Sequence, residues 1–145
     1  MKNFLIRRMK SEDAESISRI YHSIIRASNR IDFKRIIEEQ DGNSGFAAFV
    51  AEHNGYVIGY MISYIISVGF GIGKSAWITM LGVDQKFMGQ GVGRGIAIEA
   101  FKYYKERGIN NIYTTVEWDS TDMLSFFKTL DFDRSNFVNL RKVIG

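Results

Sequence analysis

The stretch Met88-Gly89-Gln90-Gly91-Val92-Gly93-Arg94-Gly95 is the most informative part of this 145-residue chain. It follows an apolar run over Ala76–Val83 that is typical of a β-strand, and it precedes Ile96–Arg107, whose apolar residues recur at helical spacing. A glycine-rich loop at the start of a helix presents backbone N–H groups without helical partners, and the helix dipole there favours negative charge. The stretch therefore predicts a binding site for a phosphate or pyrophosphate group.

Length and composition predict one domain, over residues 1–145, with a single core. Hydrophobic residues make up 46% of the chain and charged residues 24%, which excludes a disordered protein. The chain has no cysteine, so a disulfide framework, a thiolate metal site and a cysteine nucleophile are excluded. His22 and His53 have no partner at metal-ligand spacing, and we expect no metal site.

The charge and hydropathy of the chain indicate which partners and which cellular location to expect. The net charge of +3 is spread along the chain rather than gathered on one segment, so we expect no nucleic-acid partner. The longest apolar run, Val57–Phe70, is interrupted by glycine and serine and alternates as a strand does, so we expect no membrane association. The N-terminal residues lack the extended apolar segment of a signal peptide, which favours a cytoplasmic protein.

Periodicity and turn residues predict the element order βααβββαβαβ. Ser11 is the expected N-cap of the first helix, Asn54-Gly55 is a strong hairpin signal, and Gly108 is the expected C-cap of the helix before it. Antiparallel pairs come first and a strand–helix–strand crossover follows. The predicted fold class is therefore α/β (α+β), a mixed and mostly antiparallel sheet with helices on both faces. The predicted strands are 5–9, 46–52, 56–66, 77–83, 112–116 and 137–143, the later helices are 32–40, 96–107 and 120–130, and 68–75 is a glycine-rich connection.

Two other phosphate-binding patterns do not fit the chain. The P-loop pattern G-x-x-x-x-G-K-[ST] fails at Gly69–Ser75, where three residues rather than four separate the first and last glycines. A strand rather than a helix is also expected after that segment. The dinucleotide pattern G-x-G-x-x-G fails because Arg94 or Ile96 occupies its last glycine position.

The segment Val83–Gly95 resembles the acetyl-coenzyme A loop of the GCN5-related N-acetyltransferase (GNAT) family, in which a strand, a glycine-rich run and a long helix follow one another. Residues 6–13, 50–60 and 120–132 resemble the first strand and helix, the hairpin and the late helix of that family. The resemblance covers most of the chain. It implies direct transfer of an acetyl group from acetyl-CoA, used as a cosubstrate without a metal, to a primary amine of a small molecule or peptide. It also implies a monomer or a homodimer.

The resemblance further implies which residues act in the reaction. The backbone of Leu81 and Gly82 would polarise the thioester carbonyl. Glu117 is the candidate general base, because the central strand carries no carboxylate, and a solvated charge at a strand end is the alternative. The residues expected to bind acetyl-CoA are Leu81, Gly82, Val83, Met88, Gly89, Gln90, Gly91, Val92, Gly93, Arg94, Ser120 and Phe127.

The chain departs from the family pattern at two positions that matter for chemistry. Met88 stands where Arg or Gln is usual, and Phe127 stands where many members carry a tyrosine that protonates the leaving thiolate. Phenylalanine has no proton to donate. Tyr60, Tyr64 and Tyr113 are possible substitutes, and packing against neighbours is the alternative for each. A second hypothesis is therefore a catalytically impaired acyl-CoA-binding module or sensor, and a third is a nucleotide-binding structural protein.

Overall fold

A computed structural model of the chain describes residues 3–25 and 30–145. The chain forms two units, Met1–Thr115 and Val116–Gly145. The first unit contains the sheet and the helices packed on it, and the second contains a short helix and the C-terminal segment. The expectation of a single domain over residues 1–145 stays a prediction.

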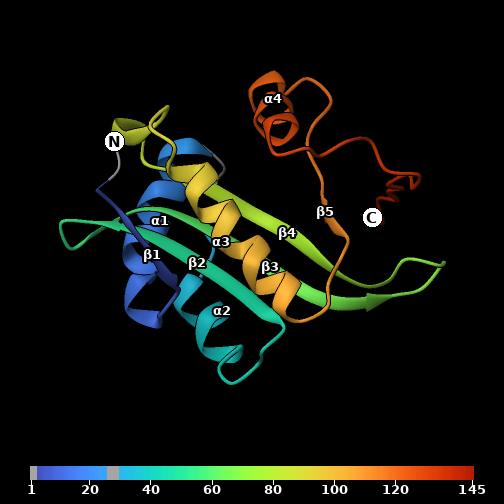
Figure 1. The fold of residues 1–145 in the computed structure, drawn as a ribbon, viewed down its shortest axis with the longest axis horizontal. Helices are drawn as coiled ribbons and strands as arrows, with labels where there is room; N and C mark the ends of the chain where they lie inside the picture. Colours follow the sequence, from blue (N-terminus) through green and yellow to red (C-terminus); the bar gives the residue numbers. More distant parts are fainter. Residues whose placement is uncertain (1–2, 26–29) are drawn as a thin grey trace. The chain divides into compact units, whose positions relative to one another are not determined.

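The described part of the first unit holds a five-stranded sheet in the order β1-β2-β3-β4-β5 (Figure 1). Neighbouring strands from β1 to β4 are antiparallel, and β5 is parallel to β4. This confirms the predicted mixed and mostly antiparallel sheet. The strands are β1 (Leu5–Arg8), β2 (Phe46–His53), β3 (Tyr56–Val68), β4 (Gly73–Val83) and β5 (Ile112–Thr114).

Helices cover both faces of the sheet, as predicted (Figure 1). Alternate residues of β2 from Phe46 to Val50 pack in one core with Ile17 and Phe33 from the first two helices. The intervening Phe49 points to the other face, where its ring meets that of Tyr103 at 5.7 Å. The two-residue period of the strand thus explains the two layers of helix. The helices are α1 (Ala14–Ile24) and α2 (Phe33–Glu39) on one face and α3 (Val92–Glu106) on the other.

The two hairpins differ in how well their turns could be predicted. Asn54 and Gly55 adopt positive φ values of 51° and 81°, which confirms the tight turn between β2 and β3. The expected glycine-rich connection over 68–75 is wrong in extent. The register continues to the pair between Val68 and Gly73, because glycine backbone groups still join the ladder, so the turn contains only residues 69–72.

Two helix starts differ from the prediction. Ser11 is not the N-cap of α1, because residues 11–13 form a 3-10 turn (η1, Ser11–Asp13) and the helix begins at Ala14. Helix α3 begins at Val92, earlier than the predicted Ile96, because Gly91 supplies a left-handed N-cap. Gly108 follows α3 with a φ of 73°, as expected for a residue that ends a helix.

The second unit contains α4 (Thr121–Thr129), which lies within the predicted helix 120–130 and has Ser120 as its N-cap rather than as its first residue. The strand predicted over Phe137–Val143 is wrong, since no strand is formed among these described residues. Val138 and Leu140 are 80% and 88% exposed. The β-propensity of a segment reflects its fit to a half-buried sheet surface, and side chains this exposed gain nothing from it. Across both units, the described residues include no helix that is long and apolar enough to cross a bilayer.

Candidate functional site

The segment that leads from β4 into α3 is held by a hydrogen bond to the sheet and by hydrogen bonds within the loop. The N–H group of Asp84 donates to the carbonyl oxygen of Ile58 at 2.8 Å. The Asp84 carboxylate accepts from the N–H group of Lys86 at 3.0 Å and so starts a 3-10 turn (η2, Gln85–Phe87). Gln90 donates from its side chain to the Lys86 carbonyl oxygen at 3.3 Å. The loop therefore leaves the sheet in a defined direction.

The start of α3 has the backbone of an anion-binding site. Gly89 and Gly91 have φ values of 77° and 83°, a conformation that residues with a side chain rarely adopt. The N–H group of Gly95 makes the first helical bond, to the Gly91 carbonyl oxygen at 2.9 Å. Helix geometry leaves the preceding first-turn amides at Val92 and Gly93 without an acceptor inside the helix. Together with the dipole of a 15-residue helix, this favours a bound anion.

Close packing anchors this helix terminus on the sheet. Val92 and Ile96 are buried on the sheet side of α3. A Cβ atom added at Gly59 of β3 would lie 2.9 Å from Cγ1 of Val92 and 3.2 Å from Cδ1 of Ile96. Glycine at position 59 is therefore required for the close approach of helix and strand. The first turn of α3 is consequently positioned by a buried contact.

Among the described residues, no strand pairs with the outer edge of β4 beside this loop. Within the described sheet, β5 pairs only with Ala76–Ile78, and a bulge in β4 follows at Thr79. Beyond the bulge β4 pairs with β3 alone. Because the N–H group of Asp84 points toward β3, the alternation of an antiparallel strand turns the backbone groups of Leu81 and Val83 to the opposite edge. These groups can pair with an extended ligand.

Gly82, between these two residues, is covered by an aromatic ring that sequence analysis did not place there. A Cβ atom at Gly82 would lie 2.6 Å from Cε1 of Tyr60 on β3. Burial raises the pKa of the Tyr60 hydroxyl well above its ordinary value, with a smaller contribution from Tyr21, so the group stays protonated. The β-bulge sets which residues face each other, and no sequence signal specifies it.

The other two tyrosines that could replace the missing acid are engaged in packing. Tyr64 meets Phe46 edge to face at 5.4 Å between ring centroids. Tyr113 stacks on Trp77 at 4.7 Å with an interplanar angle of 22°. These contacts support a packing role, rather than an acid role, for both Tyr64 and Tyr113.

Three predicted site residues lie in the second unit. Glu117 is exposed, and its backbone carbonyl oxygen accepts a hydrogen bond from the N–H group of Ser120 at 3.1 Å. Ser120 is the N-cap of α4, although its side chain makes no capping bond. Phe127 is buried, and its ring meets Phe126 at 5.2 Å and Phe132 at 5.0 Å. Of the predicted site residues, 81–83 and 88–94 thus belong to the first unit, and 117, 120 and 127 belong to the second.

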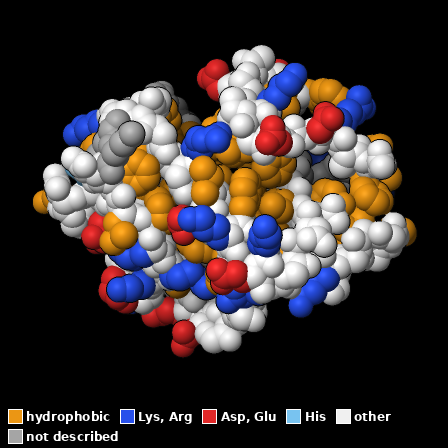
Figure 2. All heavy atoms as spheres, in the orientation of Figure 1, with side chains coloured by type: hydrophobic (Ala, Val, Ile, Leu, Met, Phe, Trp, Pro, Cys, Tyr) orange, Lys and Arg blue, Asp and Glu red, His pale blue; other side chains and the backbone are white. Residues whose placement is uncertain are grey.

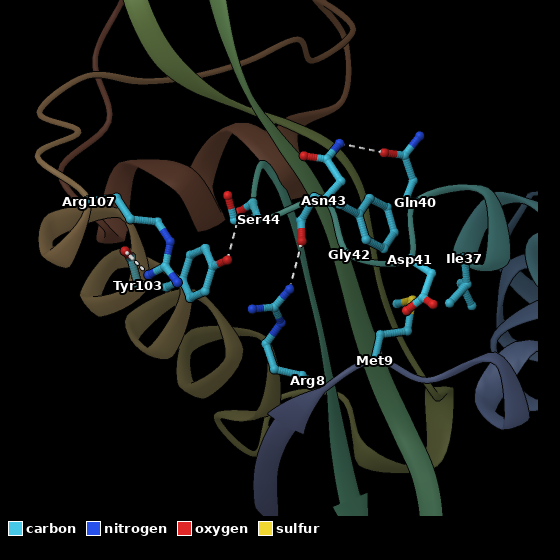
Figure 3. A pocket seen from close by; sticks show the side chains of 11 residues that line it. Arg8, Met9, Ile37, Gln40, Asp41, Gly42, Asn43, Ser44, Tyr103 and Arg107 are labelled. Atoms are coloured by element: carbon cyan, nitrogen blue, oxygen red, sulfur yellow. Dashed lines mark hydrogen bonds between the residues drawn. The ribbon is translucent and has the colours of Figure 1, made fainter.

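A cavity of about 330 Å³ lies at the opposite end of α3 from the glycine loop (Figure 3). The guanidinium groups of Arg8 and Arg107 lie over the ring of Tyr103, at 4.5 Å and 3.4 Å from its centroid. Arg8 donates to the carbonyl oxygen of Phe46 at 2.8 Å, and the Tyr103 hydroxyl donates to that of Ser44 at 2.7 Å. These contacts join β1, β2 and α3, which gives the cavity walls a structural role.

Charged side chains are mixed over the surface. On the face shown in Figure 2, basic and acidic side chains of the described residues are interspersed. No group of three His, Cys, Asp or Glu side chains in the described part of the chain could hold a metal ion. The argument for an anion at the start of α3 therefore rests on its backbone rather than on a cluster of basic side chains.

Comparisons with known proteins agree with this geometry. The model of the Acetyltransferase (GNAT) family matches residues 11–132. A mycothiol acetyltransferase of Amycolatopsis mediterranei (strain U-32) is 30% identical over 108 residues, which is 72% of this chain and 34% of that protein. This chain therefore spans about a third of the length of that curated relative.

Solved structures share the fold at low sequence identity. An aminoglycoside acetyltransferase from an uncultured soil metagenomic sample has a TM-score of 0.82 and 19% identity, covering 99% of this chain and 97% of that chain. An aminoglycoside N-acetyltransferase solved in complex with CoA has a TM-score of 0.84 and 15% identity, covering 97% and 94%. At these identities the likeness shows the fold.

Proposed function

The chain belongs to the acetyltransferase (GNAT) family, and from this premise we propose that it transfers the acetyl group of acetyl-CoA directly to a primary amine of a small molecule or peptide. One observation carries the proposal: the glycine-bounded N-terminus of α3 and the outward backbone groups of β4 lie next to each other in the chain and on the same unit. A ligand with both a diphosphate and an extended amide-bearing arm matches this pair of features, and CoA has both.

Residues 88–94 would hold the diphosphate. The first-turn amides of α3 offer several N–H donors at the positive end of the helix dipole. Gly89 and Gly91 let the backbone approach the phosphates without a side chain in the way. Arg94 is exposed on the first turn and adds a positive charge, and Met88, half exposed, offers an apolar surface in place of a polar contact.

The outer edge of β4 would hold the acyl arm. Amide groups of the arm can pair with the backbone of Leu81 and Val83 as an added strand would. The outward N–H group of Leu81 would then donate to the thioester carbonyl oxygen, where negative charge develops as the amine attacks, while the backbone of Gly82 faces β3. Acetyl-CoA supplies the activated acyl group, and the protein supplies position and polarisation.

The remaining proposed groups are Glu117, Ser120 and Phe127. The amine must lose a proton before it can attack, and Glu117 is the proposed base that takes this proton. Because Glu117 is exposed, bulk water is the alternative acceptor of the same proton. Ser120 and Phe127 are proposed to line the binding site for acetyl-CoA. A cytoplasmic location and a monomeric or homodimeric state are part of the same proposal.

A second function has specific support. Phe127 cannot donate a proton, and β4 carries no carboxylate over Gly73–Val83. These features favour an acyl-CoA-binding module or sensor that has lost catalysis. The same fold would then bind the cosubstrate without turning it over.

One assay separates the two functions. Acetyl-CoA is offered with a panel of amines that includes aminoglycosides, polyamines and peptides with free N-termini, and released CoA is measured with a thiol reagent. Because the chain has no cysteine, the reagent reports CoA alone. Turnover on any amine supports the transferase. CoA binding without turnover on the whole panel supports the module, and failure to bind CoA contradicts both.

A further inference from the structure

The ring of Tyr60 leans from β3 across β4. A Cβ atom at Gly82 would lie 2.6 Å from Cε1, 3.1 Å from Cζ and 3.2 Å from the hydroxyl oxygen of Tyr60. These atoms form the far end of the ring, so the phenol head lies directly over the strand. Position 82 must be glycine for this arrangement, because even a methyl side chain would collide with the ring.

Neighbouring aromatic rings hold Tyr60 in place. The side chain is 2% exposed, and it meets Phe33 edge to face at 6.2 Å. Phe33 in turn meets Tyr21 at 5.5 Å. Ring pairs of this geometry favour one orientation over others. The hydroxyl is therefore presented from a fixed ring.

The hydroxyl itself has no partner among the described residues. In that part of the chain every fully buried side-chain nitrogen or oxygen has a hydrogen-bond partner. None of the hydrogen bonds among the described residues involves the Tyr60 hydroxyl, so its oxygen is not completely sealed from solvent, although the side chain as a whole is 2% exposed. A hydroxyl without a protein partner can donate a hydrogen bond to a ligand that reaches it.

We propose that Tyr60 is a catalytic residue whose hydroxyl donates a hydrogen bond to the thioester sulfur as the CoA thiolate leaves. The inference rests on the proposed function, in which the acyl arm lies along the outer edge of β4 at Leu81 and Val83. The backbone N–H groups of that edge lie in the plane of the sheet and serve the carbonyl oxygen. The hydroxyl of Tyr60 approaches from above the strand and serves the other atom on which charge develops.

The reaction balances without a change in Tyr60. The amine nitrogen forms a bond to the carbonyl carbon, and the carbon–sulfur bond then breaks with its electron pair on sulfur. The nitrogen releases a proton to its base, Glu117 or water, and the departed thiolate takes a proton from water. Because burial raises the pKa of Tyr60, the hydroxyl keeps its proton and acts as a donor throughout.

The first test needs no acceptor amine. CoA is bound to the wild-type protein and to Tyr60→Phe, and the pKa of its thiol is measured from the ultraviolet absorbance of the thiolate, which has no cysteine background in this chain. A donor to sulfur should make the bound thiol more acidic in the wild type than in Tyr60→Phe by about one unit. Equal values, with CoA bound to both proteins, overturn the role of Tyr60. Failure of the wild type to bind CoA overturns the proposed function instead.

The second test uses turnover and a matched control. Tyr64→Phe removes a hydroxyl from the same strand, at a ring that packs on Phe46 rather than over Gly82. We expect Tyr60→Phe to lower kcat by about a hundredfold with unchanged CoA affinity, and Tyr64→Phe to keep the wild-type rate. With S-acetyl-4-nitrothiophenol, whose thiol leaves readily, the defect of Tyr60→Phe should shrink to within about threefold. An undiminished defect with this donor contradicts a role at sulfur.

Discussion

Arg7 and Asp13 form a bidentate ion pair that joins β1 to the start of α1. Nη1 of Arg7 lies 2.9 Å from Oδ2 of Asp13, and Nη2 lies 2.8 Å from Oδ1. The same carboxylate accepts from the N–H group of Lys10 at 2.8 Å, and Nε of Arg7 also donates to Glu52 at 3.0 Å. The pair therefore ties the first helix to two strands of the sheet.

Asp13→Asn is expected to destabilise the protein by roughly 2 to 3 kcal/mol at neutral pH, since it leaves a charge-assisted bidentate pair unmade. Burial raises the pKa of Asp13, but the hydrogen bonds from Arg7 and from the Lys10 N–H group outweigh it, and the net pKa is lower than usual. The stabilisation is thus present above the unfolded pKa of about 3.9 and is lost as the pH falls through the folded value. Urea unfolding of both proteins at several pH values tests this. A difference in unfolding free energy that stays constant into acid contradicts it.

Gly91→Val is expected to weaken CoA binding at least about tenfold, because valine resists the left-handed conformation that ends the loop. Gly42→Val is the matched control. Gly42 has a φ of 79° and, like Gly91, has no atom within 4 Å of an added Cβ, but it lies in the turn after α2. Both variants should lose similar stability, and calorimetry with CoA should show an affinity change only for Gly91→Val. Equal affinities would remove residues 88–94 from the proposed site.

Gly82→Ala is expected to cost about 1 to 3 kcal/mol of stability, because the added methyl group meets the Tyr60 ring at 2.6 Å. In a Tyr60→Leu background the same change should cost less, since leucine lacks the far end of the ring. Urea unfolding of the four proteins in this cycle gives the coupling energy. Additive costs would mean that the two side chains do not compete for the same space.

Alkaline pH is expected to destabilise the protein through Tyr104. Burial raises the pKa of Tyr104 to about 12, although its hydrogen bond to Ser63 acts in the opposite direction. A pKa raised on folding gives stability that is complete below the unfolded value of 10.0 and is lost as the pH rises toward the folded value. The free energy of unfolding should therefore fall by up to roughly 2 kcal/mol over this range. Tyr104→Phe should show a shallower fall in chemical denaturation, and an identical slope would exclude this residue as a cause.

Local chemistry made several parts of the fold predictable. Asn54-Gly55 specifies its turn because both residues accept positive φ. The alternation in β2 and the helical spacing in α1 determine which side chains face the core, because each depends on a period within one element. The glycine run before α3 could be predicted to precede a helix for the same reason, and its proposed role as a phosphate site depends only on the backbone of that helix terminus.

Other features depend on contacts between distant parts of the chain. The bulge at Thr79 and the register between β3 and β4 place Tyr60 over Gly82, although 22 positions of sequence separate them, and no local pattern encodes that register. The segment 137–143 has strand-forming residues yet forms no strand, because strand formation depends on a partner surface. Sequence alone thus determined most of the elements, their order up to α4 and the glycine-rich loop before α3, each set by neighbours along the chain. Only the tertiary structure decided which hydroxyl covers the end of β4, because that requires two strands to pair in one register.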